Sequence, residues 1–144
     1  ILFFGTAGTG TNPVFGPFPN FVMNGKTQPE AMNLRAGTRY RFRLFNLAGD
    51  TPLLVSMNAG DTPINWRAVA KDGYPLPPSQ AVSRAAVLLF EPGEIYDFEY
   101  TPTAAGELAL KFGPPPPPPG PPPPPGSPPP PTPPPTITAL VHVR

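Results

Sequence analysis

The chain has 144 residues, a net charge of +1 and no cysteine, and 39% of its residues are hydrophobic. This length and apolar content suffice for one domain with a hydrophobic core. A charge near zero excludes a long-range field that would gather nucleic acid or anionic lipid, so neither nucleic acid nor a membrane is an expected partner. The lack of cysteine excludes disulfides, thiolate metal sites and a cysteine nucleophile.

Residues 1–20 carry four glycines and three prolines among scattered phenylalanines. This composition predicts an irregular connector, so we expect residues 1–20 to be an incoming interdomain linker and residues 21–144 to form the domain. The chain opens on apolar residues without the methionine and basic region of a signal peptide. We therefore expect it to be a piece of a longer protein.

From Phe21 onward, short strand-like runs alternate with turn residues. The clearest run is 38–46, where apolar residues alternate with Arg39, Arg41 and Arg43, which predicts one buried face and one face in water. No stretch shows a sustained helical period. The sequence therefore predicts an all-β sandwich or barrel of eight or nine strands. The other predicted strands lie at 21–24, 31–35, 53–58, 65–70, 85–90, 94–102 and 107–112.

A proline tract separates the last run from the rest. Eighteen of the 29 prolines lie between Pro114 and Pro135, and such runs adopt the extended polyproline II conformation. Residues 136–143 then alternate again between apolar and polar. A strand of this length left alone would expose an unpaired edge. We therefore expect 136–143 to be the last strand of the domain and 114–135 to be a low-complexity insertion before it.

Three stretches together resemble the multicopper oxidases, the family of laccase-like enzymes built from cupredoxin domains. They are FVMNGKTQPEAMNLRAGTRYRFRLFNLAG at 21–49, WRAVAKDGYPLPP at 66–78 and LLFEPGEIYDFEYTPTAAGELALKF at 88–112. Their order is similar to that in the second domain of a three-domain member. The resemblance implies a Greek-key cupredoxin-like β-sandwich, sister cupredoxin domains as partners, and an extracellular or periplasmic parent.

This chain lacks the copper-ligating residues of the family. In multicopper oxidases the mononuclear copper takes one cysteine and two histidines, and the trinuclear cluster takes His-x-His pairs. This chain has no cysteine and one histidine, His142, so neither centre can be assembled from it. The resemblance accounts for this, because three-domain members carry their ligands in the first and third domains.

We therefore expect no catalytic, cofactor-binding or metal-ligating residue in this chain, and copper only in the parent enzyme. The parent would oxidise phenolic or metal one-electron donors and reduce dioxygen to water, with this segment as scaffold and interdomain surface. His142 lacks partners for a metal site and is expected to be a structural or surface residue.

Three other features could carry function. The arginine row fits a solvated strand face or a surface that docks a sister domain, but not nucleic-acid binding, since no exposed aromatics interleave with it. An acidic group in 91–99 lacks the spacing of a calcium loop and does not establish the geometry of a catalytic carboxylate pair. Trp66 could line a pocket, but a single tryptophan in a small β domain is expected in the core. The acidic group consists of Glu91, Glu94, Asp97 and Glu99.

An alternative of a different class is a stand-alone extracellular β-sandwich that binds or supports a partner and is presented by its proline tract. Polyproline II can dock in aromatic grooves, which makes a proline-tract binder a further partner to consider. The tract lacks the flanking basic residues that orient such ligands, which favours a spacer or inserted loop. HxH motifs upstream and an HCH motif downstream in the parent reading frame would favour the oxidase.

Overall fold

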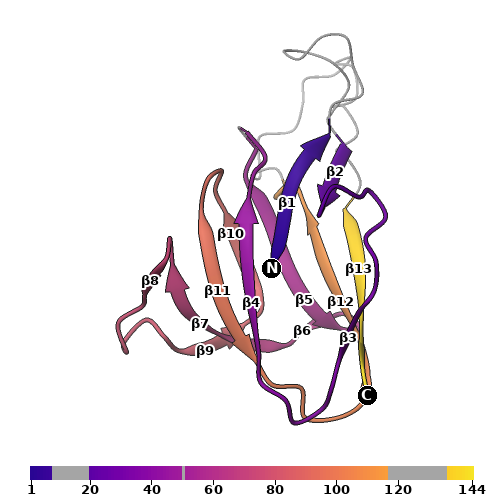
Figure 1. Ribbon diagram of the computed structural model, residues 1–144, viewed down its shortest axis with the longest axis vertical. Coiled ribbons are helices and arrows are strands. Elements are labelled where there is room, and N and C mark those ends of the chain that lie inside the picture. The colour runs from indigo at the N-terminus through magenta and orange to yellow at the C-terminus, as the bar shows by residue number, and fades with distance from the viewer. Residues whose placement is uncertain (8–19, 50, 117–135) are drawn as a thin grey trace, which may run out of the picture.

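A computed structural model describes residues 1–7, 20–49, 51–116 and 136–144. These residues form thirteen strands, arranged as two mixed sheets that face each other (Figure 1). The described residues contain no helix long and apolar enough to cross a membrane. The prediction of an all-β sandwich is therefore confirmed.

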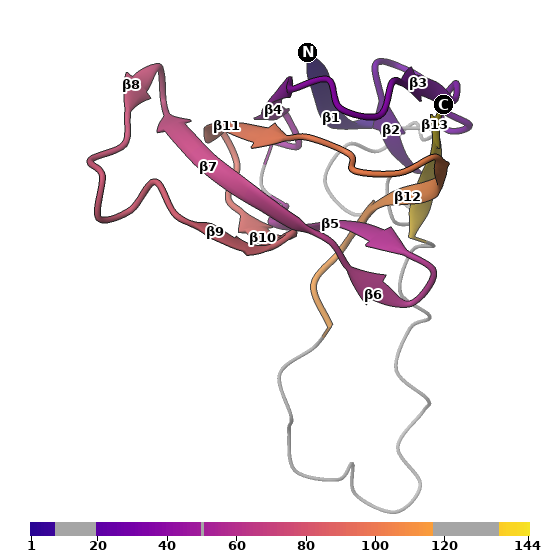
Figure 2. The ribbon, with the colours of Figure 1, turned by 90° about the horizontal axis from the view of Figure 1, so that it is seen from below.

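Sheet A has seven strands. Its order is β2 (Asn20–Met23), β1 (Leu2–Ala7), β4 (Tyr40–Asn46), β11 (Ile95–Tyr100), β7 (Asn65–Lys71) and β8 (Tyr74–Pro75), with β9 (Ser83–Ala85) also paired to β7. Strands β1 and β4 run parallel, and the other pairs in this sheet are antiparallel. Figure 2 shows β8 and the adjoining end of β7 projecting beyond β10 of the opposite sheet.

Sheet B has six strands. Its order is β10 (Val87–Phe90), β5 (Leu53–Ala59), β12 (Gly106–Gly113), β13 (Ile137–Val143) and β3 (Met32–Leu34), with β6 (Thr62–Pro63) also paired to β5. The chain passes between the sheets at a corner where the Ala86 amide donates to the Ile64 carbonyl at 2.7 Å. The Met57 amide in turn donates to the Ala86 carbonyl at 3.0 Å. This corner closes one side of the sandwich.

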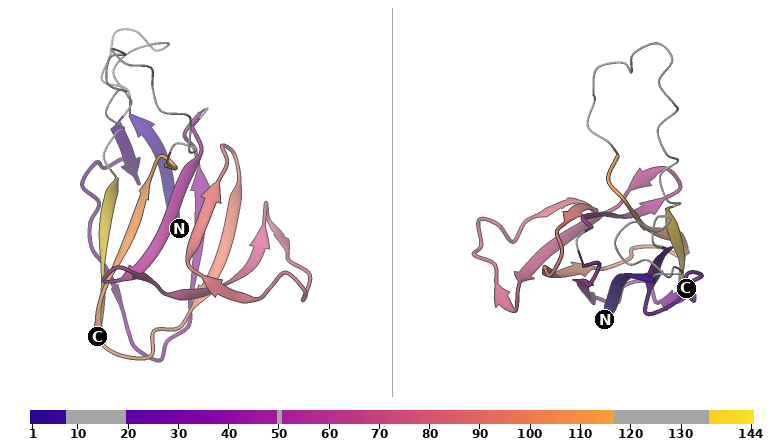
Figure 3. Two further views of the ribbon diagram at one scale, coloured as in Figure 1. Left: turned by 180° about the vertical axis from the view of Figure 1, so that it is seen from behind. Right: turned by 90° about the horizontal axis from the view of Figure 1, so that it is seen from above.

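Strand β13 lies inside sheet B, between β12 and β3 (Figure 3). It pairs antiparallel with β12 from Ile137, opposite Phe112, to Val143, opposite Gly106. On its other side it runs parallel to β3, with His142 opposite Asn33. The alternating tail is thus an integral strand, and the insertion predicted before it falls mostly on residues 117–135, which lie outside the described residues.

The core between the sheets is rich in aromatic rings. Trp66 of β7 is 1% exposed and stacks on Phe98 of β11, with ring centroids 4.0 Å apart and planes 16° apart. Phe4 of β1 meets Phe112 of β12 at 4.8 Å, edge to face, which joins the two sheets. The edge-to-face geometry of Phe4 and Phe112 is among those favoured for aromatic pairs. The prediction that Trp66 is a core residue is confirmed.

The prediction of an irregular connector at residues 1–20 is wrong for residues 2–7. Residues 2–7 form β1, which runs parallel to β4 with Leu2 opposite Leu44 and antiparallel to β2 with Phe4 opposite Met23. Leu2 and Phe4 are buried. The local sequence gives a weak strand signal because Gly5 interrupts a short apolar run, so pairing with distant strands decides the structure. Residues 8–19 lie outside the described residues.

Two turns explain why the chain reverses where it does. Asn24 and Gly25 have φ of 51° and 78°, and Asp72 and Gly73 have φ of 49° and 87°. Positive φ at both central residues defines the type I′ turn, which matches the twist of a two-residue hairpin and favours Asn-Gly and Asp-Gly. The Asp72 carboxylate also accepts from the Ile95 amide at 2.9 Å, which ties the second turn to β11.

Replacing Gly73 with alanine is expected to lower the free energy of unfolding by about 1 kcal/mol, because an added Cβ is disfavoured in the left-handed region. Gly106→Ala is the matched control, since Gly106 has no positive φ and a Cβ there meets no atom within 4 Å. Its effect should stay within about 0.5 kcal/mol. Urea unfolding of both variants measures the difference, and equal effects would contradict the assigned turn.

Candidate functional site

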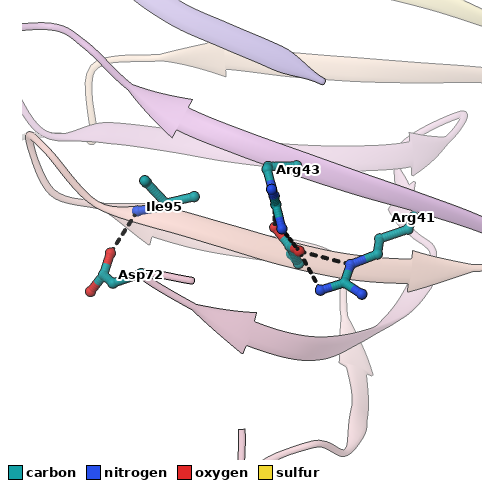
Figure 4. Close-up of polar contacts among 5 residues, drawn as sticks. Arg41, Arg43, Asp72 and Ile95 are labelled. Atoms are coloured by element: carbon teal, nitrogen blue, oxygen red, sulfur yellow. Dashed lines mark hydrogen bonds and ion pairs between the residues drawn. The ribbon is translucent and has the colours of Figure 1, made fainter. Parts of the chain in front are cut away.

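The most concentrated chemistry lies on the outer face of sheet A, where two arginines share one carboxylate (Figure 4). Asp97 of β11 is 2% exposed. Its Oδ1 accepts from Arg43 Nε at 2.8 Å, and its Oδ2 accepts from Arg43 Nη2 at 2.8 Å and from Arg41 Nε at 2.7 Å. The buried carboxylate thus holds two guanidinium groups in fixed positions.

Strand alternation and register create this cluster. Arg41 and Arg43 are two residues apart on β4 and therefore point to the same face. Asp97 lies directly opposite Arg43 in the β4–β11 ladder. On the other side of β11, the register with β7 shifts between Asp97 and Phe98, which marks a β-bulge. Successive residues of β11 point to opposite faces of the sheet, so Phe98 packs in the core and Asp97 meets the arginines.

The electrostatics make this carboxylate a fixed anion. Hydrogen bonds from Arg43, and after them those from Arg41, lower the pKa of Asp97 against the opposing effect of its burial. The same contact raises the pKa of Arg43. A carboxylate with a lowered pKa is a poor general base near neutral pH. The cluster is suited to holding charge in place rather than to moving protons.

The other predicted acidic residues do not gather around Asp97. Glu99 pairs with Arg67 at 3.3 Å, and Glu94 pairs with Lys71 at 2.6 Å. The Lys71 ammonium also lies 5.3 Å from the centre of the Tyr96 ring, and its pKa is raised, first by the hydrogen bond to Glu94 and then by that to Tyr96. Glu99 therefore joins β11 to β7, and Glu94, just before β11, forms a separate ion pair with β7.

The described residues contain no group of three or more His, Cys, Asp or Glu side chains that could hold a metal ion. His142 lies on β13, where its Nδ1 is 3.5 Å from a carboxylate oxygen of Glu107 on β12. Sheet B separates it from the cluster at Asp97. With one imidazole and no thiolate in the whole sequence, the donor set does not fit a mononuclear blue-copper centre or a multi-imidazole cluster.

A hollow of about 590 Å³ lies at the lower end of sheet A, lined by Arg39, Arg67, Glu99 and Tyr100 among others. Burial raises the pKa of Tyr100, which keeps its phenol protonated. Arg67 is engaged by Glu99 and also donates to the Ala81 carbonyl at 2.9 Å. Arg67 and Glu99 are thus engaged with each other, and the raised pKa of Tyr100 disfavours its phenolate as a nucleophile.

Sequence reasoning missed the aromatic neighbours of the arginine cluster. Phe3 on β1 lies directly opposite Phe45 on β4, and their ring centroids are 4.9 Å apart. The apolar run before Gly5 was the available signal for this strand, but its position in the sheet depends on pairing with residues some forty positions later.

No protein-family model and no curated protein matches the sequence. Its fold, however, matches solved structures, and these define the class: the chain has the cupredoxin-like sandwich fold found in multicopper oxidases. The expected fold is thereby confirmed.

Three of these structures show the extent of the match. A blue copper oxidase from Nitrosomonas europaea aligns with 92% of this chain at a TM-score of 0.60 and 17% identity. The laccase-like multicopper oxidase CueO from an Ochrobactrum species aligns with 99% at 0.62 and 18% identity, and Fet3p, a multicopper oxidase that functions in iron import, with 78% at 0.61 and 16%. The chain covers 39%, 30% and 22% of those chains, respectively, and so spans well under half of each.

Proposed function

We propose that this chain is the copper-free second domain of a three-domain multicopper oxidase and acts as scaffold and interdomain surface. One combination of observations carries the proposal: the fold matches multicopper oxidases over most of the chain, while the sequence holds one histidine and no cysteine. A domain with this fold and without these ligands fits a position that separates copper-bearing sister domains.

The packing of the sandwich supports a role as a spacer. An aromatic core packs the seven strands of sheet A against the six of sheet B. Ion pairs also join three neighbouring strands of sheet A. A sandwich with these contacts holds its two faces at a fixed separation. Residues on its outer faces can therefore position neighbouring domains without taking part in electron transfer.

The proposal extends to the parent enzyme. It would oxidise phenolic or metal one-electron donors with reduction of dioxygen to water, and it would work outside the cell or in the periplasm. Copper would be held by the sister domains. This chain contributes no ligand, so no step of the reaction is assigned to its residues.

The test is the full-length parent protein. We expect its reading frame to carry HxH motifs before this segment and an HCH motif after it, and the purified protein to contain copper and consume dioxygen with a phenolic donor. A parent without these motifs and without copper would contradict the proposal and favour a stand-alone β-sandwich module.

A further inference from the structure

The outer face of sheet A is divided into a charged half and an apolar half. We name this surface the sheet A face and define it by the outward side chains of β1, β4, β11 and β7 together with the adjoining Val22 and Leu47. The cross-strand register places Arg41, Glu99 and Arg67 in one row and Arg43 with Asp97 in the next. The following row is apolar and consists of Phe3, Phe45 and Ile95.

The apolar half is accessible to a partner. Leu47 is 61% exposed and Phe3 41%. Val22 and Leu47 lie on either side of Gly5, within 3.7 Å and 4.0 Å of the position a Cβ would take there. The glycine leaves a notch between two aliphatic side chains. Phe3 and Phe45 are in ring contact, and Val22 and Leu47 flank the next outward position of β1, so these apolar residues neighbour one another beside the arginines.

The charged half has unused capacity to bind an anion. Two guanidinium groups share the single carboxylate of Asp97, which leaves one positive charge in excess. Their side chains remain 53% and 42% exposed for Arg41 and Arg43, respectively, so N–H donors not used by Asp97 remain accessible. A hollow of about 260 Å³ opens over them, and Ile1 lines it together with the three charged residues. Guanidinium groups favour carboxylates, which they can bind through two hydrogen bonds.

The opposite surface of the sandwich lacks this combination. Leu89 of β10 and Leu140 of β13 are exposed on sheet B, but β5 and β12 lie between these two strands. A row across this sheet runs from Val87 through Ser56 and Lys111 to Thr138. Val87 also leaves an exposed apolar side chain beside Leu89, but Asp97 is the only buried carboxylate among the described residues, so sheet B has no arginines held in the same way beside them.

We propose that the sheet A face is the surface that binds a sister domain of the parent chain, through an acidic side chain of that domain flanked by apolar residues. This inference rests on the proposed function. Protein interfaces are enriched in aromatic residues and arginine, and Asp97 holds the two arginines in place before binding, which reduces the entropy that docking would cost. The acidic side chain binds Arg41 and Arg43, and the apolar residues cover Phe3, Phe45 and Leu47.

Hydroxyl-radical footprinting of the full-length parent tests this inference with residues of one type. In the domain alone, Leu47 is 61% exposed, Leu89 53% and Leu140 41%, so a free sheet A face would make Leu47 at least as reactive as the other two. We expect Leu47 to be modified several-fold more slowly than Leu89 and Leu140. Equal or faster modification of Leu47 in a parent that holds copper would overturn the inference and leave the proposed function standing.

A charge variant tests the acidic partner. Arg41→Gln leaves the two hydrogen bonds of Arg43 to Asp97 in place and should therefore preserve the fold. It is expected to raise the modification of Leu47 several-fold. Arg84→Gln is the control. Arg84 is the cross-strand partner of Trp66 and so does not belong to the sheet A face. This variant should leave Leu47 protected. Unchanged protection of Leu47 in Arg41→Gln would also overturn the inference. So would protection that disappears when the parent is diluted, because that would mean that a second copy of the protein covers Leu47.

Discussion

Replacing Trp66 with alanine is expected to lower the free energy of unfolding by about 3 to 5 kcal/mol, the usual cost of removing a large buried aromatic side chain. Trp66 is 1% exposed and its ring stacks on Phe98, so the variant loses both the transfer of the indole from water and the contacts of a closely packed pair. Chemical denaturation monitored by circular dichroism measures the change, since the variant lacks tryptophan fluorescence.

Tyr74→Ala is the matched control for this prediction. Tyr74 is an aromatic residue of the neighbouring strand β8 but is largely exposed. Its removal should change stability by no more than about 0.5 kcal/mol. A Trp66 variant as stable as the Tyr74 variant would mean that Trp66 does not form part of the core.

Replacing Asp97 with alanine is the second large effect, with an expected loss of about 1.5 to 3 kcal/mol at neutral pH, the range for hydrogen bonds to a charged group. The substitution removes a buried carboxylate and leaves Arg41 and Arg43 close together without their shared anion. Urea unfolding measures the loss. Glu30→Ala is the control, because Glu30 forms an exposed ion pair with Lys26, and such pairs contribute little to stability.

The contribution of Asp97 should also depend on pH in a defined direction. Its pKa is lower in the folded than in the unfolded state, first because of Arg43 and then Arg41. The folded state therefore binds the proton less readily, and the stabilisation is fully present above the unfolded value of about 3.9. It is lost as the pH falls through the lower folded pKa. Asp97→Ala should remove this part of the acid dependence, and an identical acid profile in the variant would contradict the assigned ion pairs.

The sequence was sufficient to locate most of the strands. The alternation of Tyr40, Phe42 and Leu44 with arginines predicts a strand with one buried face, and the structure places β4 there, with Phe42 and Leu44 buried. Asp72-Gly73 marks a reversal because few other residue pairs adopt positive φ twice in succession. In both cases the signal lies in adjacent residues, which is why it could be read without the fold.

Features that depend on distant pairing could not be predicted in this way. Strand β1 is positioned by its pairing with β4. Asp97 contacts Arg43, which lies 54 positions away in the sequence. The alternation placed Arg41 and Arg43 on the outer side, but it could not show that a carboxylate from β11 would lie buried between them. That arrangement follows from the β4–β11 register, which is a property of the assembled sheet.

The apolar half of the sheet A face shows the same limitation. Phe3 and Phe45 each looked like an ordinary phenylalanine in its own segment, and Phe3 was expected to belong to a connector. Only the parallel pairing of β1 with β4 brings them together beside the arginines. A prediction of this surface from sequence would have needed the order of strands in the sheet.

The most direct test of the copper-free assignment is a metal analysis of two proteins after the same exposure to copper: the 144-residue chain and its full-length parent. We predict that after dialysis the parent retains copper, whereas the chain retains none in stoichiometric amount and shows no visible thiolate-to-copper absorption, since it has no cysteine. Stoichiometric copper retained by the chain, or a parent that binds none, would contradict its assignment as the copper-free domain of a multicopper oxidase.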